Sequence, residues 1–125
     1  MVNPKHKALS LYLIVDDSEK LVELLKIIFE AKVLRKFDHE NGKIAHIELK
    51  LDDSVLMISN SKENYPAYKT ILHIYVPNDI TTFNLAIKNG CKIIEKPINK
   101  DGDPDTRGSF YDSGDNYWSV STQRN

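Results

Sequence analysis

Cysteine and long apolar runs are scarce in this chain. Its single cysteine, Cys91, has no partner for an internal disulfide bond. No apolar run approaches the roughly 20 residues that a membrane-spanning helix needs. The polar residues 2–7 (VNPKHK) lack the apolar core of a secretory signal. Because structural disulfides belong to oxidising compartments, we expect a reducing, cytoplasmic setting and no membrane partner.

Charge of one sign and standard catalytic motifs are also missing. The 17 Lys and Arg residues are matched by 18 Asp and Glu residues, which gives a net charge of -1. A nucleic-acid or anionic-membrane partner usually requires a basic surface, so we expect neither. The sequence has no Gly-x-Ser-x-Gly nucleophile elbow, no phosphate-binding glycine loop and no cysteine pair with metal-ligand spacing.

The first half of the chain predicts a strand, a helix and three further strands. The expected elements are a strand over 8–15, a helix from Asp16 to about Ala31, and strands over 33–40, 43–51 and 54–59. Asp16 with Glu19 three residues later is a capping-box pattern. Asn41-Gly42 favours a type I′ hairpin turn, which needs positive φ at both of its central positions.

The second half predicts the same order of elements. The expected elements are a strand over 71–76, a helix that begins at 77–79, a strand over 91–96, a loop over 97–104, and strands over 107–111 and 116–122. Gly90 is placed to end the helix. Gly114, in the turn between the last two strands, is free to take a positive φ.

The two halves therefore repeat one unit. The strand LYLIV over 11–15 matches LHIYV over 72–76, and a helix follows each. Such a repeat rarely arises by chance, and a half-open sheet has to bury its apolar face against another layer. We predict an α+β fold of two tandem βαβββ modules that form a curved mixed sheet enclosing a cleft. Module one covers about 8–60, a linker 61–68 and module two about 69–122, in a single domain over 1–125.

Two segments carry a family resemblance. LYLIVDD over 11–17 and IAHIELKLDDSVLM over 44–57 are similar to the opening module of PhnB-like proteins. These belong to the glyoxalase/bleomycin resistance/dioxygenase (vicinal oxygen chelate) superfamily. Their last hairpin typically reads Asp-Pro-Phe-Gly-His, where this chain has DSGDNYW over 112–118. The resemblance implies the glyoxalase/bleomycin resistance fold and a homodimer. Relatives include metal-dependent lyases, isomerases and dioxygenases, and metal-free drug-sequestering proteins.

The resemblance also locates the metal ligands of the catalytic relatives, on the first and last strand of each module. Ser10, Met57, Ile71 and Ser119 stand at those positions. Methionine and isoleucine offer no hard donor atom, and serine hydroxyls are poor ligands for divalent metals. We therefore predict no standard metal centre and no cofactor, with a displaced divalent metal as the alternative.

Strand alternation predicts which side chains line the cleft. A two-residue turn at Asp52-Asp53 pairs Glu48 with Met57 and puts His46 on the same inner face. His46 and Glu48 are the candidate catalytic pair. The candidate ligand-binding residues are Tyr12, Met57, His73, Tyr75, Arg107, Tyr117 and Ser119. This mixture of polar and aromatic groups suits a small polar-aromatic ligand.

Each of these residues also has an ordinary structural interpretation. His46 can be a sheet-face histidine bonded to Glu48 or to solvent, and Glu48 can pair with a lysine across the strands. A slip of one residue would turn His73 outward. The tyrosines can pack at the core or rim, and a lone Arg107 at a loop edge is usually solvated. Burial favours inert packing for Cys91.

Three functions follow from this pattern. The first is a protein that binds a small organic molecule in its cleft without the standard metal. The second is an enzyme of the lyase, isomerase or dioxygenase type that uses a displaced metal or the His46 and Glu48 pair. The third is a non-catalytic interaction module whose cleft is filled by side chains.

Overall fold

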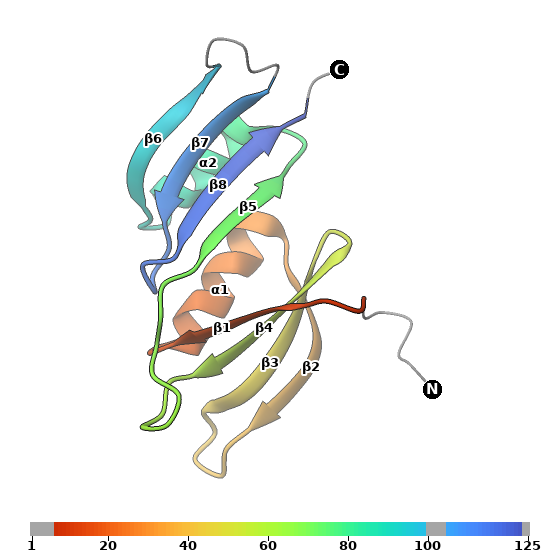
Figure 1. Cartoon of the computed structure of the whole chain (residues 1–125), viewed down its shortest axis with the longest axis vertical. Coiled ribbons are helices and arrows are strands. Elements are labelled where there is room, and N and C mark those ends of the chain that lie inside the picture. The colour runs from red at the N-terminus through yellow and green to blue at the C-terminus, as the bar shows by residue number, and fades with distance from the viewer. Residues whose placement is uncertain (1–6, 100–104, 124–125) are drawn as a thin grey trace. The chain divides into compact units, whose positions relative to one another are not determined.

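The computed structural model describes residues 7–99 and 105–123, in two compact units. The first unit ends at Tyr68 and the second begins at Lys69. Each unit consists of a strand, a helix and three strands (Figure 1). Within the described ranges, neither helix is long and apolar enough to cross a membrane.

Each unit forms a mixed four-stranded sheet. The first contains β1 (Leu11–Val15), α1 (Ser18–Phe29), β2 (Lys32–Asp38), β3 (Ile44–Leu51) and β4 (Ser54–Asn60), in the strand order β1-β4-β3-β2. The second contains β5 (Ile71–Tyr75), α2 (Asp79–Lys88), β6 (Lys92–Asn99), β7 (Thr106–Tyr111) and β8 (Tyr117–Thr122), in the order β5-β8-β7-β6. In each sheet the first strand pairs in parallel with the last, and the other pairs are antiparallel. The two predicted βαβββ modules are therefore confirmed.

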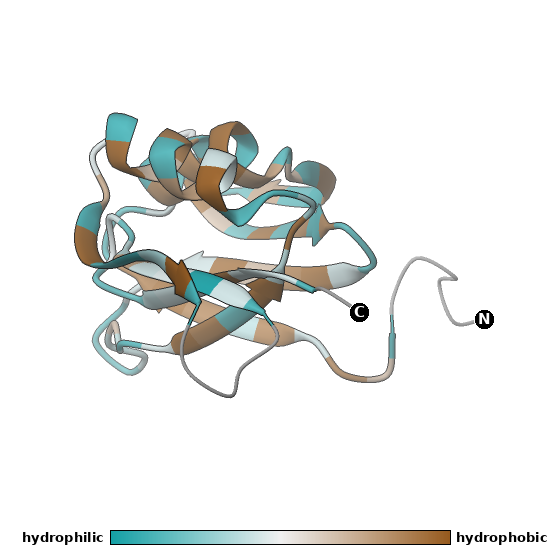
Figure 2. Cartoon of the chain, turned by 90° about the horizontal axis from the view of Figure 1, so that it is seen from above, coloured by the Kyte–Doolittle hydropathy of each residue, from teal (hydrophilic) through white to brown (hydrophobic). Residues whose placement is uncertain are grey.

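The helix of each unit covers one face of its own sheet. Polar and apolar residues alternate along the helices and strands (Figure 2), and the apolar ones meet between helix and sheet. The buried residues of the first unit include Leu21 and Leu25 of α1 with Leu13, Ile47, Leu49 and Ile58 of the sheet. Those of the second include Phe83 and Ala86 of α2 with Phe110, Trp118 and Val120. Such burial stabilises by roughly 25 cal/mol per Å² of apolar surface. The opposite face of each sheet, which we call the open face, is left for other side chains.

The start of α1 differs from the capping box predicted at Asp16. Asp17 is the N-cap, and its carboxylate accepts from the backbone N–H of Lys20 at 3.1 Å. The Glu19 carboxylate instead accepts from the backbone N–H of Ile44 at 2.8 Å, which ties α1 to β3 and lowers the pKa of Glu19. Asp16 accepts from the Ser61 hydroxyl. Of two adjacent aspartates, tertiary contacts therefore decide which one caps the helix.

Two turns take conformations that the sequence did not predict. At 39–43 only Gly42 has a positive φ, of 85°, and its N–H donates to the carbonyl of His39 at 2.9 Å. The hairpin thus has the longer loop in which a left-handed residue follows the turn, not a type I′ turn. Between β7 and β8 the positive φ, of 61°, belongs to Asp115 and not to Gly114.

Strand β6 extends further than predicted. It runs through Pro97 to Asn99, where the sequence predicted a loop, and residues 100–104 of that loop lie outside the described residues. An edge strand tolerates proline because one side of its backbone needs no partner. Pro97 packs onto β7 at Gly108, where an added Cβ would lie 2.9 Å from Pro97 Cγ and 3.1 Å from Phe83 Cδ2. Only glycine leaves room for that contact.

A buried carboxylate organises the hairpin between β7 and β8. Asp112 Oδ1 accepts from the backbone N–H groups of Gly114 and Asn116, at 2.7 and 3.0 Å. Asp112 Oδ2 accepts from the Asn116 amide at 3.1 Å and from Trp118 Nε1 at 2.7 Å. Asn116 Oδ1 in turn accepts from the N–H of Thr70, just before β5. The acidic side chain therefore fixes the hairpin, the core tryptophan and the start of β5 together.

Replacing this carboxylate should destabilise the protein. We expect Asp112→Ala to lower the free energy of unfolding by about 3 kcal/mol, since it leaves the buried Trp118 and Asn116 donors without acceptors. Urea denaturation measures the loss. Ser113→Ala, at an exposed position of the same turn, should change it by less than about 0.5 kcal/mol. A loss below about 1 kcal/mol for Asp112→Ala would contradict this role.

Candidate functional site

A row of four side chains crosses the open face of the first unit. The strand register pairs Tyr12 with Met57, Met57 with Glu48, and Glu48 with Arg35. The predicted pairing of Glu48 with Met57 is therefore confirmed. His46, two residues before Glu48 on β3, stands on the same face.

The Glu48 carboxylate is buried at the centre of this face, with only 2% of its side chain exposed. Nε and Nη2 of Arg35 each donate to one of its oxygens at 3.0 Å. This bidentate pair raises the pKa of Arg35. Nε2 of His46 lies 3.1 Å from Oε2 of Glu48. Glu48 thus pairs across the strands with Arg35 and also bonds His46, whereas the ordinary interpretation expected a lysine across the strands.

The other ring nitrogen of His46 faces two hydroxyl groups. Nδ1 lies 3.2 Å from the Tyr12 hydroxyl and 3.4 Å from the Ser59 hydroxyl, which are 2.6 Å from each other. An ionised carboxylate only accepts hydrogen bonds, so a neutral His46 donates from Nε2 to Glu48. Its Nδ1 is then left as an acceptor for either hydroxyl. We call these five residues, Arg35, Glu48, His46, Tyr12 and Ser59, the polar chain.

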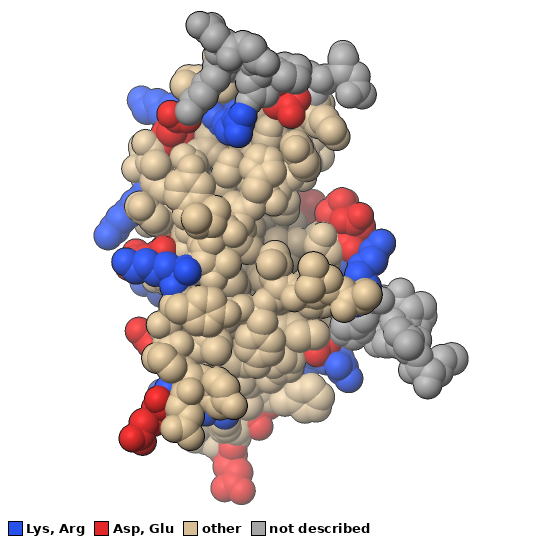
Figure 3. Space-filling view, viewed as in Figure 1, with Lys and Arg blue, Asp and Glu red and all other residues tan. Residues whose placement is uncertain are grey.

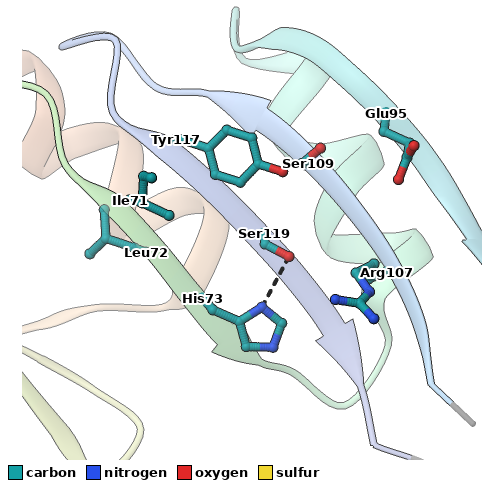
Figure 4. A pocket seen from close by; sticks show the side chains of 8 residues that line it. All are labelled: Ile71, Leu72, His73, Glu95, Arg107, Ser109, Tyr117 and Ser119. Atoms are coloured by element: carbon teal, nitrogen blue, oxygen red, sulfur yellow. Dashed lines mark hydrogen bonds between the residues drawn. The ribbon is translucent and has the colours of Figure 1, made fainter. Parts of the chain in front are cut away.

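The open face of the second unit contains a pocket of about 290 Å³. It is lined by Ile71, Leu72, His73, Glu95, Arg107, Ser109, Tyr117 and Ser119 (Figure 4). Four of the predicted ligand-binding residues, His73, Arg107, Tyr117 and Ser119, thus lie around one cavity. Tyr75 is not among its lining residues, and its ring contacts His73 edge-on at 4.9 Å between centroids. Tyr12 and Met57 lie on the first unit.

His73 and Ser119 meet in the middle of the pocket. His73 Nδ1 is 3.0 Å from the Ser119 hydroxyl (Figure 4). Burial lowers the pKa of His73, and the positive charge of Arg107 lowers it further, against a smaller opposite effect of Asp105. Above its lowered pKa the imidazole is neutral, so Arg107 supplies the positive charge on this side of the pocket.

Sequence reasoning missed Ser109 and Glu95 in the pocket and Arg35 in the polar chain. Ser109 lies two residues from Arg107 on β7, so the alternation that governs a strand could have identified it. Glu95 and Arg35 lie on edge strands with register shifts, between Ile93 and Glu95 and between Val33 and Arg35. A bulge changes which residues share a face, and no local signal predicted it.

The positions of the family's metal ligands do not fit a divalent metal. Met57 lies on β4, Ile71 at the start of β5 and Ser119 on β8. Their thioether, alkyl and hydroxyl side chains are poor donors for Zn²⁺, Fe²⁺ or Mn²⁺. Across residues 7–99 and 105–123, no group of three or more His, Cys, Asp or Glu side chains is placed to hold a metal ion.

Cys91 is buried, as the sequence predicted. Burial, together with the negative charge of Asp112, raises the pKa of its thiol to about 12. A thiol with so high a pKa carries almost no nucleophilic thiolate near neutral pH.

Similarity to solved structures identifies the fold of the chain. TioX from Micromonospora sp. ML1 aligns with a TM-score of 0.80 at 16% identity, over 94% of this chain and 99% of that one. FosX, a fosfomycin resistance protein from Listeria monocytogenes, aligns with a TM-score of 0.72 at 12% identity, over 99% of this chain and 96% of that one. A glyoxalase/bleomycin resistance protein/dioxygenase family enzyme from Burkholderia phytofirmans PsJN aligns with a TM-score of 0.72 at 12% identity. The alignment covers 90% of this chain and 95% of that one. No family model and no curated protein matches.

The chain therefore has the fold of the glyoxalase/bleomycin resistance/dioxygenase superfamily, as its sequence predicted. Identities of 12–16% establish that fold alone. The function has to be argued from the site.

The ionisation of His73 offers a direct test of the pocket's electrostatics. We expect its imidazole to titrate below the usual 6.5, and Arg107→Gln to raise that pKa because it removes a nearby positive charge. An NMR titration of the ring Cε1–H signal measures both. Lys88→Gln, at an exposed position of α2 on the covered side of the sheet, should leave the value unchanged. A midpoint at or above 6.5 would contradict this picture.

Proposed function

We propose that this chain is a PhnB-like protein that binds a small organic molecule in the pocket of its second unit, without the superfamily's standard metal centre. The observation that carries the proposal is the pocket itself. It combines a few convergent polar groups, His73, Arg107 and Ser119, with the apolar walls of Ile71 and Leu72. Small-molecule sites usually have this composition.

The size of the pocket limits the ligand. About 290 Å³ is close to the lower end of the range for ligand pockets, roughly 300–1,000 Å³. A single ring with one or two substituents fits such a space. An open pocket also favours ligand binding over an interaction module whose cleft is filled by side chains.

One relative of the same fold illustrates a ligand of this size. A FosX mutant from Listeria monocytogenes was solved with Mn(II) and 1S,2S-dihydroxypropylphosphonic acid. For the present chain we propose a small ligand without the manganese, since Met57, Ile71 and Ser119 are poor metal donors. The family resemblance also leads us to propose a homodimer, and the single cysteine leads us to propose a cytoplasmic setting.

A fragment screen tests the binding proposal. We expect some small aromatic and polar compounds to raise the melting temperature of the full chain and to shift the backbone amide NMR signals of Ser109 and Ser119. Tyr117→Ala removes a wall of the pocket and should weaken such hits roughly tenfold.

Tyr65→Ala, which removes an exposed tyrosine of the first unit, is the matched control and should leave the hits unchanged. Hits that never shift the signals of the pocket residues would refute the proposal.

The polar chain supports a second candidate function, an enzyme with His46 and Glu48 as its acid–base pair. Glu48 is held by Arg35 and by Nε2 of His46, so the imidazole is oriented with Nδ1 toward Tyr12 and Ser59. A base held by a carboxylate and facing a hydroxyl is the usual arrangement for proton transfer. Glu48 would position the imidazole, and Nδ1 would receive the proton.

The tautomer of His46 tests this arrangement. In long-range ¹H–¹⁵N spectra of the neutral ring we expect the proton on Nε2 in at least about tenfold excess, because a charge-assisted bond to Glu48 holds it there. Glu48→Gln should reduce the excess, and the exposed His39 serves as an internal reference. A proton on Nδ1 would exclude His46 as a base toward Tyr12 or Ser59.

A further inference from the structure

The pocket of the second unit is rich in hydrogen-bond donors. Arg107, Ser109, Tyr117 and Ser119 all carry N–H or O–H groups, and among the described residues that line the pocket Glu95 alone carries a carboxylate. Figure 4 shows the Arg107 side chain extending from β7 toward the middle of the pocket, and the Tyr117 ring reaching over β8 toward Ser109. Donors that converge from β7 and β8 favour a ligand that accepts hydrogen bonds.

Ser109 offers the pocket a hydroxyl group that a ligand could bond. Ser109 is only 4% exposed and lines the pocket. In the part of the chain that the structure describes, no hydrogen bond is formed by its hydroxyl. The hydroxyl oxygen is not among the atoms that are sealed from solvent without a partner, so it faces the pocket and is available to bond a group bound there.

The charge around these donors is positive on the Arg107 side. The positive charge of Arg107 affects His73 more strongly than the negative charge of Asp105 does. A guanidinium carries five N–H donors in a planar fork, which suits Arg107 to an anionic group. Glu95 lies on β6 beside Ser109, so we expect an anionic group to lie on the Arg107 side of the pocket, away from this carboxylate.

We propose that the ligand of this pocket is a small organic anion, with its carboxylate-like group held by Arg107, Ser109 and Ser119 and its apolar part against Ile71 and Tyr117. This inference rests on the proposed binding function and specifies its ligand class. An anion bound by an arginine fork and hydroxyl groups gains charge-assisted hydrogen bonds that a neutral molecule of the same shape does not.

Three molecules of similar shape test the charge preference on the ¹⁵N-labelled full chain at pH 7. They are phenylacetate, neutral phenylacetamide and cationic phenethylamine. We expect phenylacetate to shift the Ser109 and Ser119 amide signals saturably, with a Kd at least about tenfold lower than that of phenylacetamide. Phenethylamine should bind most weakly.

Variants locate the source of the preference. Arg107→Gln should abolish the tenfold preference for phenylacetate while phenylacetamide binds as before. Arg107→Lys keeps the charge but not the fork, and should retain part of the preference. Lys88→Gln removes the same charge from α2 and should retain all of it. Unchanged spectra away from the pocket show that each variant is folded.

The pH dependence adds an independent readout. Among residues 7–99 and 105–123, the charged and titratable groups around His73 are Arg107 and Asp105 of the β7 segment, Glu95 of β6, and the hydroxyls of Tyr75 and Tyr117. Protonation of His73 adds a second positive charge, whereas a carboxylate with a pKa near 4.3 stays ionised. Phenylacetate should therefore bind more tightly at pH 5.5 than at pH 7.5, and His73→Gln should remove that change.

The outcomes separate this inference from the proposed function. If phenylacetamide or phenethylamine binds in the pocket as tightly as phenylacetate, the anion class is wrong and the binding function stands. The same conclusion follows if none of the three binds while neutral fragments do. If neither these probes nor the fragments bind in the pocket, both proposals fail.

Discussion

One helix covers only one face of each four-stranded sheet, and this constraint shapes both halves of the molecule. The covered face takes the large apolar side chains, such as Leu49 in the first unit and Trp118 in the second. Since strand side chains alternate between faces, every second residue is left on the open face. There the sheet needs polar groups that satisfy one another, or a ligand that satisfies them.

The two open faces meet that need in different ways. Tyr12, Met57, Glu48 and Arg35 occupy one row across the first sheet, and the corresponding row of the second holds His73, Ser119, Ser109 and Glu95. In the first, the Arg35–Glu48 ion pair fills the centre and satisfies its own charges. In the second, the small Ser109 stands where Glu48 stands in the first. The pocket therefore lies where the second sheet has a small serine and the first sheet has a large charged side chain.

The sequence was a good guide wherever local chemistry decides the structure. The repeated LYLIV and LHIYV strands, and the glycine at position 90 with φ of 97° after α2, gave the two modules correctly. The two-residue turn after β3 fixed the register that puts Glu48 opposite Met57. In these cases a short segment contains all the information that its conformation needs.

The sequence predictions failed where residues distant in the chain decide the local structure. Asp16 and Asp17 are equally good caps on local grounds, and the contacts with Ser61 and Lys20 assign their roles. Glu95 and Arg35 reach the open faces through bulges on edge strands, which alternation cannot predict. The shared cleft of the two modules stays a prediction.

Asp112 has a consequence for how such a protein can change. It anchors the hairpin, Trp118 and the start of β5, and it is not itself among the described residues that line the pocket. The scaffold is thus secured by one set of side chains, and ligand contact is left to another. Substitutions at Ser109, Tyr117 or Arg107 can therefore alter which ligand the pocket binds while the hairpin that supports it stays in place. Related proteins could differ in ligand selectivity and still share this scaffold.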